Sequence, residues 1–142
     1  PRTGDERNND AIGMTMEQTD LYTATFTFAK GEYDDEFHQL DQAIAEVAKA
    51  IPGYLGEEAW ENPASGLIST VYYWRSLEAL QQLIDHPMHL AAKQKQAKWI
   101  NGYHIVVGRV IRSYGDGRTP HPLSSEPRMT GEAFGTNGNP QP

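Results

Sequence analysis

The segment from Tyr103 to Ile111 constrains the fold of this chain more than any other part of the sequence. It reads Tyr-His-Ile-Val-Val-Gly-Arg-Val-Ile, and its β-branched residues predict a long final strand from Tyr103 to Tyr114. Apolar residues occupy both alternations of this strand, and successive side chains in a strand point to opposite faces of the sheet. Both faces of the sheet must therefore be covered.

Three earlier segments also have the composition of strands. Residues 21–29 alternate aromatic residues and alanine with threonine, residues 67–74 are β-branched and aromatic, and residues 54–61 form a weaker strand that Asn62-Pro63 ends. The first of these strands stops at Gly31. Four strands are therefore expected.

Two helices are expected between the strands. Acidic residues at 34–36 favour a helix N-terminus, and an apolar stripe with a spacing of three and four follows, formed by Phe37, Leu40, Ile44, Val47 and Ile51. Ser76 is the expected cap of the second helix. Pro87 restarts this helix with Asp85 or His86 as the new cap, and Asn101-Gly102 ends it.

The resulting order, β-α-β-β-α-β, predicts an α+β protein of the ferredoxin-like type, with one antiparallel sheet and two helices on one face. Two helices cover one face of the sheet, so we expect the other face to meet a partner, most simply in a symmetric homodimer. We expect residues 20–115 to form this domain, residues 1–19 a polar tail, and residues 116–142 an extended arm anchored by Met129 and Phe134.

Composition excludes several classes of protein. The chain has 142 residues, enough for one domain, and no cysteine, which rules out disulfides, thiolate zinc sites and a cysteine nucleophile. Its net charge is −7, and residues 1–62 hold 14 acids against 4 bases, so we expect no nucleic-acid partner. No apolar run approaches the ~18 residues of a membrane span, and no signal-peptide pattern is present, which predicts a cytoplasmic protein without a membrane partner.

Several short motifs point to one family. They are Pro-Gly-Tyr-Leu at 52–55, Tyr-Trp-Arg-Ser-Leu-Glu-Ala-Leu at 73–80, His-Pro-Met-His at 86–89 followed by Ala91-Ala92, and the final strand with Arg109, Arg112 and Tyr114-Gly115. With these motifs the chain resembles the antibiotic biosynthesis monooxygenase family of the dimeric α+β barrel superfamily, over residues 20–115. The resemblance implies a homodimer whose sheets face each other, with a pocket between sheet and helices in each subunit.

The resemblance also implies an activity. Cofactor-independent oxygenases of this group act on an aromatic or enolic small molecule, whose deprotonated form reduces dioxygen to give a quinone or ketone. We therefore expect a monooxygenase without a cofactor, whose protein binds the substrate, removes its proton and stabilises the anion. The alternative is a non-catalytic protein that binds a small apolar ligand or heme.

Three residues are the candidate catalytic residues. His89 lies in the first turn after Pro87, where the helix dipole disfavours an imidazolium and keeps a neutral base available; otherwise it is a packing residue. Trp74 matches a tryptophan of the quinone-forming relatives, although the amide expected four residues earlier is Thr70; otherwise Trp74 is a residue of the core and of the dimer interface. His104 lies beside Gly108 on the final strand and either faces a cavity or is a core histidine.

Tyr72, His86 and Arg75 are the candidate substrate-binding residues. Tyr72 shares a strand face with Trp74, His86 is a helix cap close to His89, and Arg75 either binds an anion or stays in solvent. His86 and His89 stand three residues apart, but nothing in the sequence completes a ligand set, so no metal site is expected.

The heme-degrading relatives provide a contrast. They resemble this chain around Trp74, and they use a helix tryptophan nine residues later and a histidine ten residues beyond that, where this sequence has Leu83 and Lys93. Their first-strand asparagine has no counterpart in residues 21–28. Heme degradation by that mechanism is therefore disfavoured, while heme binding through His89 or His86 stays open.

Overall fold

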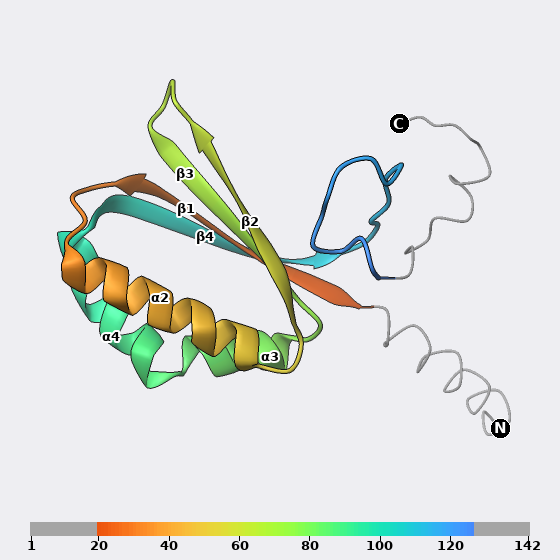
Figure 1. The fold of residues 1–142 in the computed structure, drawn as a ribbon, viewed down its shortest axis with the longest axis horizontal. Helices are drawn as coiled ribbons and strands as arrows, with labels where there is room; N and C mark the ends of the chain where they lie inside the picture. Colours follow the sequence, from red (N-terminus) through yellow and green to blue (C-terminus); the bar gives the residue numbers. More distant parts are fainter. Residues whose placement is uncertain (1–19, 127–142) are drawn as a thin grey trace, which may run out of the picture.

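The structure, a computed structural model, describes residues 20–126 (Figure 1). The expected N-terminal tail and the expected anchors Met129 and Phe134 lie outside this range. The elements are β1 (Leu21–Lys30), α2 (Asp35–Ala50), β2 (Tyr54–Asn62), β3 (Leu67–Trp74), α3 (Leu77–Ile84), α4 (Pro87–Lys95), the 3₁₀ turn η1 (Gln96–Lys98) and β4 (Ile100–Val110).

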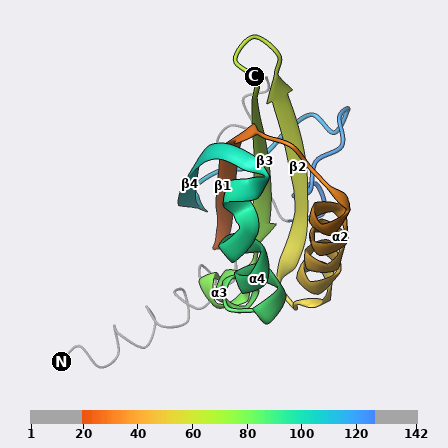
Figure 2. The ribbon, with the colours of Figure 1, turned by 90° about the vertical axis from the view of Figure 1, so that its left-hand side faces the viewer.

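The four strands form one antiparallel sheet in the order β2-β3-β1-β4. All three helices lie on one face of this sheet, with α2 on the β2 side and α4 on the β1 and β4 side (Figures 1 and 2). The predicted α+β, ferredoxin-like fold is therefore confirmed. Within residues 20–126 no helix is both long and apolar enough to cross a membrane.

Side-chain caps begin the helices where the sequence places them. Asp34 accepts a hydrogen bond from the Phe37 amide at the start of α2, and Ser76 accepts one from the Ala79 amide at the start of α3. Pro87 opens α4, and its cap is His86, whose Nδ1 accepts from the amide of Met88 at 3.1 Å. The second expected helix is thus divided into α3 and α4 at Pro87.

The last strand lies earlier in the chain than expected. Asn101 and Gly102, which were predicted to end a helix, belong to β4 instead, and β4 ends at Val110. The reason is a tertiary contact, because the carbonyl of Trp99 accepts a hydrogen bond from Gly31 at 2.8 Å and the Trp99 indole donates to Asp34 at 3.0 Å. These bonds bring residue 100 into register with the end of β1.

The main core lies between the sheet and the helices. Trp74 is its centre and is completely buried. The other buried members of this cluster are Ala24, Ala48, Ile51, Ala79, Leu80 and Leu83. Small alanine side chains from β1, α2 and α3 leave the room that the indole fills.

The opposite face of the sheet is partly covered by the segment that follows β4. Leu123 is buried there against Leu21 and Tyr73. The Arg75 guanidinium donates to both carboxylate oxygens of Glu126, at 3.1 and 2.8 Å. The part of the predicted arm that the structure describes therefore packs on its own domain.

Both faces of β4 stay open in the single chain. Tyr103, Ile105 and Val107 on the helix side and Val106 on the other side are each about half exposed, between 47% and 56%. The segment after β4 covers Val110 but none of these four residues. The requirement that Tyr103–Ile111 be covered is thus not met within residues 20–126.

Leu123 gives a test of how firmly the segment after β4 is held. Truncating a buried leucine to alanine costs about 2–5 kcal/mol, and we expect about 2 kcal/mol for Leu123→Ala because the segment is able to detach. Denaturant unfolding measures this free energy. Leu77→Ala, at a position 47% exposed, is the control and should change it little. Equal losses in the two variants would contradict the docked arrangement.

Candidate functional site

A cavity of about 370 Å³ lies between the sheet and the helices. Its walls come from all four strands, from α2, α3 and α4, and from η1. The lining is mainly apolar and aromatic, with Phe26, Phe37, Leu40, Ile44, Leu83, Trp99, Tyr103 and Ile105 among its members. This volume is at the small end of the range of small-molecule pockets, about 300–1,000 Å³.

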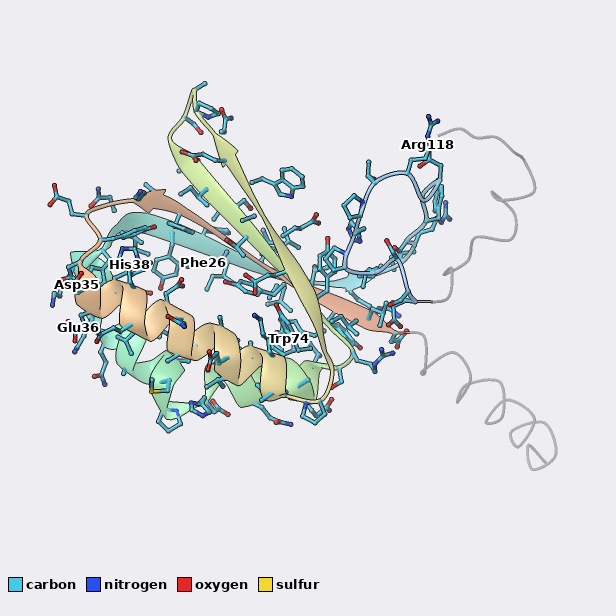
Figure 3. The ribbon with its side chains drawn as sticks, in the orientation of Figure 1. Phe26, Asp35, Glu36, His38, Trp74 and Arg118 are labelled. Atoms are coloured by element: carbon cyan, nitrogen blue, oxygen red, sulfur yellow. The ribbon has the colours of Figure 1, made fainter. Side chains whose placement is uncertain are left out.

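Trp74 contributes a buried polar atom to this cavity wall. The indole lies between the sheet and α2 (Figure 3), and its edge-to-face partner is Tyr54, with ring centroids 5.3 Å apart. The Nε1 atom is buried and has no hydrogen-bond partner among residues 20–126. A buried donor without a partner costs about 1–3 kcal/mol.

His89 lines the same cavity from the first turn of α4. Its Nδ1 is also buried without a hydrogen-bond partner within the described residues. Burial lowers the pKa of His89, the charge of Lys93 lowers it further, and the backbone of Ile84 acts in the opposite direction. The imidazole is therefore neutral at pH 7 and is able to accept a proton.

Tyr72 is the third predicted residue that the fold brings to the cavity. It pairs in register with Ala24 of β1 and with Glu57 of β2, so the three residues share the face that the helices cover. Burial, followed by the charges of Glu57 and Asp41, raises the pKa of the Tyr72 phenol. The hydroxyl therefore keeps its proton across the physiological range.

Asp41 and Glu57 were missed by the sequence analysis although both line the cavity. The periodicity of α2 contains the signal, because Asp41 stands one turn after Phe37 and one turn before Ala45, which also line it. Glu57 stands opposite Tyr72 in the β2–β3 register. Burial and the charge of Glu57 raise the pKa of Asp41, while His38 acts in the opposite direction.

The remaining predicted residues lie elsewhere. His86 is the cap of α4, and Arg75 is paired with Glu126. His104 is exposed on β4 in register with Thr27, on the sheet face away from the helices. The fold therefore brings His89, Trp74 and Tyr72 to one cavity, and it does not bring the other three candidates there.

Few groups at this site suit a metal or heme iron. Residues 20–126 contain no cluster of three or more His, Asp or Glu side chains that could hold a metal ion. Among the histidines of this range, His89 alone lines the cavity. Of the two positions compared with the heme-degrading relatives, Leu83 packs in the core and Lys93 lines the cavity.

Comparisons with known proteins identify one sequence relative and several similar folds. No family model matches the chain. The Bacillus subtilis (strain 168) protein YqjZ, described as uncharacterized, is 33% identical over 104 residues, which is 72% of this chain and 90% of YqjZ. A match of this extent is a family relationship.

The similar structures share the fold at low sequence identity. The protein SO0527 from Shewanella oneidensis is 9% identical to this chain, with a TM-score of 0.54. The match covers 65% of this chain and 92% of SO0527. SnoaB from Streptomyces nogalater, described as a cofactor-independent oxygenase, is 13% identical to this chain, with a TM-score of 0.52. The match covers 69% of this chain and 98% of SnoaB. At these identities the likeness concerns the fold.

The lowered pKa of His89 predicts a pH dependence of stability. As the pH falls below about 6.5, the ordinary value for histidine, the unfolded chain binds the proton before the folded chain does. His89 therefore makes the protein less stable as the pH falls from about 6.5 toward its folded-state pKa. His89→Gln removes this contribution, so the loss of unfolding free energy between pH 7 and pH 5 should be smaller in the variant.

Denaturant titrations at the two pH values measure this difference. Gln82→Ala, at an exposed position on α3, changes no ionisable group, so it is the control and should retain the pH dependence of the parent protein. An unchanged pH dependence in His89→Gln would show that this histidine titrates alike in the folded and unfolded chains.

Proposed function

Because this chain belongs to the family of Bacillus subtilis YqjZ and shares its fold with SnoaB, we propose that it is a cofactor-independent monooxygenase of the antibiotic biosynthesis monooxygenase superfamily. Its substrate is an aromatic or enolic small molecule that occupies the cavity between sheet and helices. The observation that supports this proposal most is that His89 and Trp74, from α4 and β3, line one apolar cavity, and that burial lowers the pKa of His89.

His89 is the proposed general base. A neutral imidazole in an apolar cavity removes a proton from the phenol or enol, and burial keeps the imidazole in that form before substrate binds. The Trp74 Nε1 is fully buried, so its proposed donation to the charged substrate oxygen requires the indole to shift when the substrate binds. Lys93, one helical turn after His89, adds a positive charge on the same side of the cavity.

The oxidation balances without a cofactor. The electron-rich anion transfers electrons to dioxygen, and an oxygen atom becomes bonded to the oxidised carbon. Loss of the C–H bond at that same carbon and cleavage of the O–O bond then give a ketone or quinone, and the other oxygen atom leaves as water. The protein supplies proton transfer, orientation and an apolar enclosure, whereas the substrate supplies the electrons.

The proposal includes a homodimer. Val106, on the sheet face away from the helices, is 56% exposed in the single chain, and a second copy would cover it. A symmetric pairing through the sheet face away from the helices buries Val106, beside the region that Leu123 already covers. The cavity lies on the helix side of the sheet, so each protomer keeps its own site.

Turnover tests the role of His89. Oxygen uptake with hydroquinones and anthrones in metal-free buffer should fall roughly 10²–10⁴-fold in His89→Gln, which keeps volume and hydrogen bonding but does not titrate in this range. The loss should shrink for substrates acidified by electron-withdrawing groups. Gln82→Ala, at an exposed position on α3 outside the cavity, is the control and should keep full turnover. Near-normal turnover in His89→Gln would exclude it as the base.

The same assay separates the proposal from the non-catalytic alternative. A ligand-binding protein should oxidise none of these compounds, and a heme-binding one should bind heme tightly with a shift of the Soret band. The heme shift should then disappear in His89→Gln, because His89 is the described histidine that lines the cavity. Oxygen uptake by the metal-free parent protein would contradict this alternative.

Sedimentation equilibrium tests the dimer. The parent protein should sediment at about twice the mass of one chain. Val106→Asp places a charge on the sheet face away from the helices, where a paired sheet would bury it, and should shift the protein toward monomer. Leu90→Asp, at a position on α4 that is 46% exposed, is the control and should leave the mass unchanged. A monomeric parent protein would contradict the pairing.

A further inference from the structure

The helical part of the chain between β3 and β4 is broken directly before the residue proposed as the base. α3 ends at Ile84, α4 begins at Pro87, and His89 lies in the first turn of α4 (Figure 1). In an unbroken helix the amides of residues 87 and 88 would donate to the carbonyls of residues 83 and 84. Pro87 has no amide hydrogen, so the first of these bonds is absent. The start of α4 therefore depends on the bond that replaces the second.

The side chain of His86 takes the amide of Met88 out of this helical pattern. Its Nδ1 accepts a hydrogen bond from the Met88 N–H at 3.1 Å, and the His86 amide donates to the carbonyl of Leu83 at 3.1 Å. Because Nδ1 is the acceptor, a neutral His86 carries its proton on Nε2. The His86 carbonyl then accepts a hydrogen bond from the amide of Leu90 at 3.0 Å. His86 thus closes α3 with its own amide and opens α4 with its side chain and its carbonyl.

These bonds determine where His89 lies. His89 is the third residue of α4, so its backbone belongs to the turn that the bonds from Met88 and Leu90 to His86 close. The same bonds leave the carbonyl of Ile84 without the Met88 amide, and the side chain of His89 interacts with the backbone of Ile84. From this turn the imidazole of His89 reaches the cavity wall.

We propose that His86 is a positioning residue for the reaction, because its hydrogen bond from Met88 holds the first turn of α4 and thereby keeps the imidazole of His89 in the apolar cavity. This inference rests on the proposed function, which makes His89 the base. His86 is not among the residues that line the cavity, so it acts through His89 and does not contact the substrate.

The pKa of His89 measures its position without turnover. Burial is the main cause that lowers this pKa, so a first turn that frays should let it rise toward the ordinary value of about 6.5. His86→Leu removes the acceptor and should cause this rise. His86→Asn is similar in size to the leucine variant but keeps a capping acceptor, so it should leave the pKa close to that of the parent protein. NMR titration follows the imidazole signals, and His89→Gln identifies the signal of His89 among the five histidines.

Ser76→Ala is the matched control. It removes the cap of α3, where the Ala79 amide donates to the Ser76 Oγ at 3.0 Å, a bond of the same kind as the one that His86 accepts. α3 does not carry His89, so the pKa of His89 should stay at the parent value. His86→Ala also lacks the acceptor and gives the same comparison if His86→Leu does not fold.

Oxygen uptake gives a second readout. His86→Leu should lower kcat about 10- to 100-fold with a smaller change in KM, because the binding cavity is retained while the base is misplaced. His86→Asn should keep turnover close to that of the parent protein, and so should Ser76→Ala. A loss that asparagine rescues is the result expected for a cap.

Four results would overturn the positioning role. They are an unchanged pKa of His89 in His86→Leu or His86→Ala, an equal rise in His86→Asn, an equal rise in Ser76→Ala, and full turnover of an active protein in His86→Leu. The first three do not depend on oxygen uptake, so the positioning role is able to fail while the oxygenase proposal stands. If the pKa of His89 shifts as expected while the parent protein oxidises no substrate, the positioning of His89 stands and the oxygenase proposal fails.

Discussion

The packing of Trp74 determines where everything else in this domain lies. The indole is fully buried at the end of β3, where Tyr22 and Tyr54 flank it in the sheet and Ala48 and Ala79 face it from α2 and α3. Removing such a side chain typically costs about 3–5 kcal/mol, a large part of the stability of a small domain. Trp74 therefore anchors both helices to one end of the sheet.

The cavity follows from this anchoring. At the Trp74 end the layers are in close contact, and toward the other end Trp99 closes the space by packing against Phe37, with ring centroids 5.4 Å apart. Asp34 fixes that end through hydrogen bonds from Trp99 and from the amide of Phe37. Aromatic side chains at both ends hold the sheet and helices apart, so an apolar cavity lies between them with polar groups entering at His89, Asp41 and Glu57.

Local chemistry in the sequence predicted the elements well. Asp34, Ser76 and Pro87 are capping or first-turn residues whose preference is a property of the backbone beside them, and each begins a helix in the structure. The end of the last helix was predicted wrongly because Asn101-Gly102 is a turn signal by itself. The contacts of Trp99 with Gly31 and Asp34 oppose that signal and place both residues in β4.

The sequence by itself determined the order of the elements and the face on which each residue lies, because periodicities of 2 and 3.6 are properties of single elements. It therefore placed Trp74 and Tyr72 together on one face of β3. Only the tertiary structure decided that Asp41 of α2 and Glu57 of β2 line one cavity, and that Arg75 is paired with Glu126. Which side chain lies opposite another depends on how distant elements pack, and no pattern within one element contains that information.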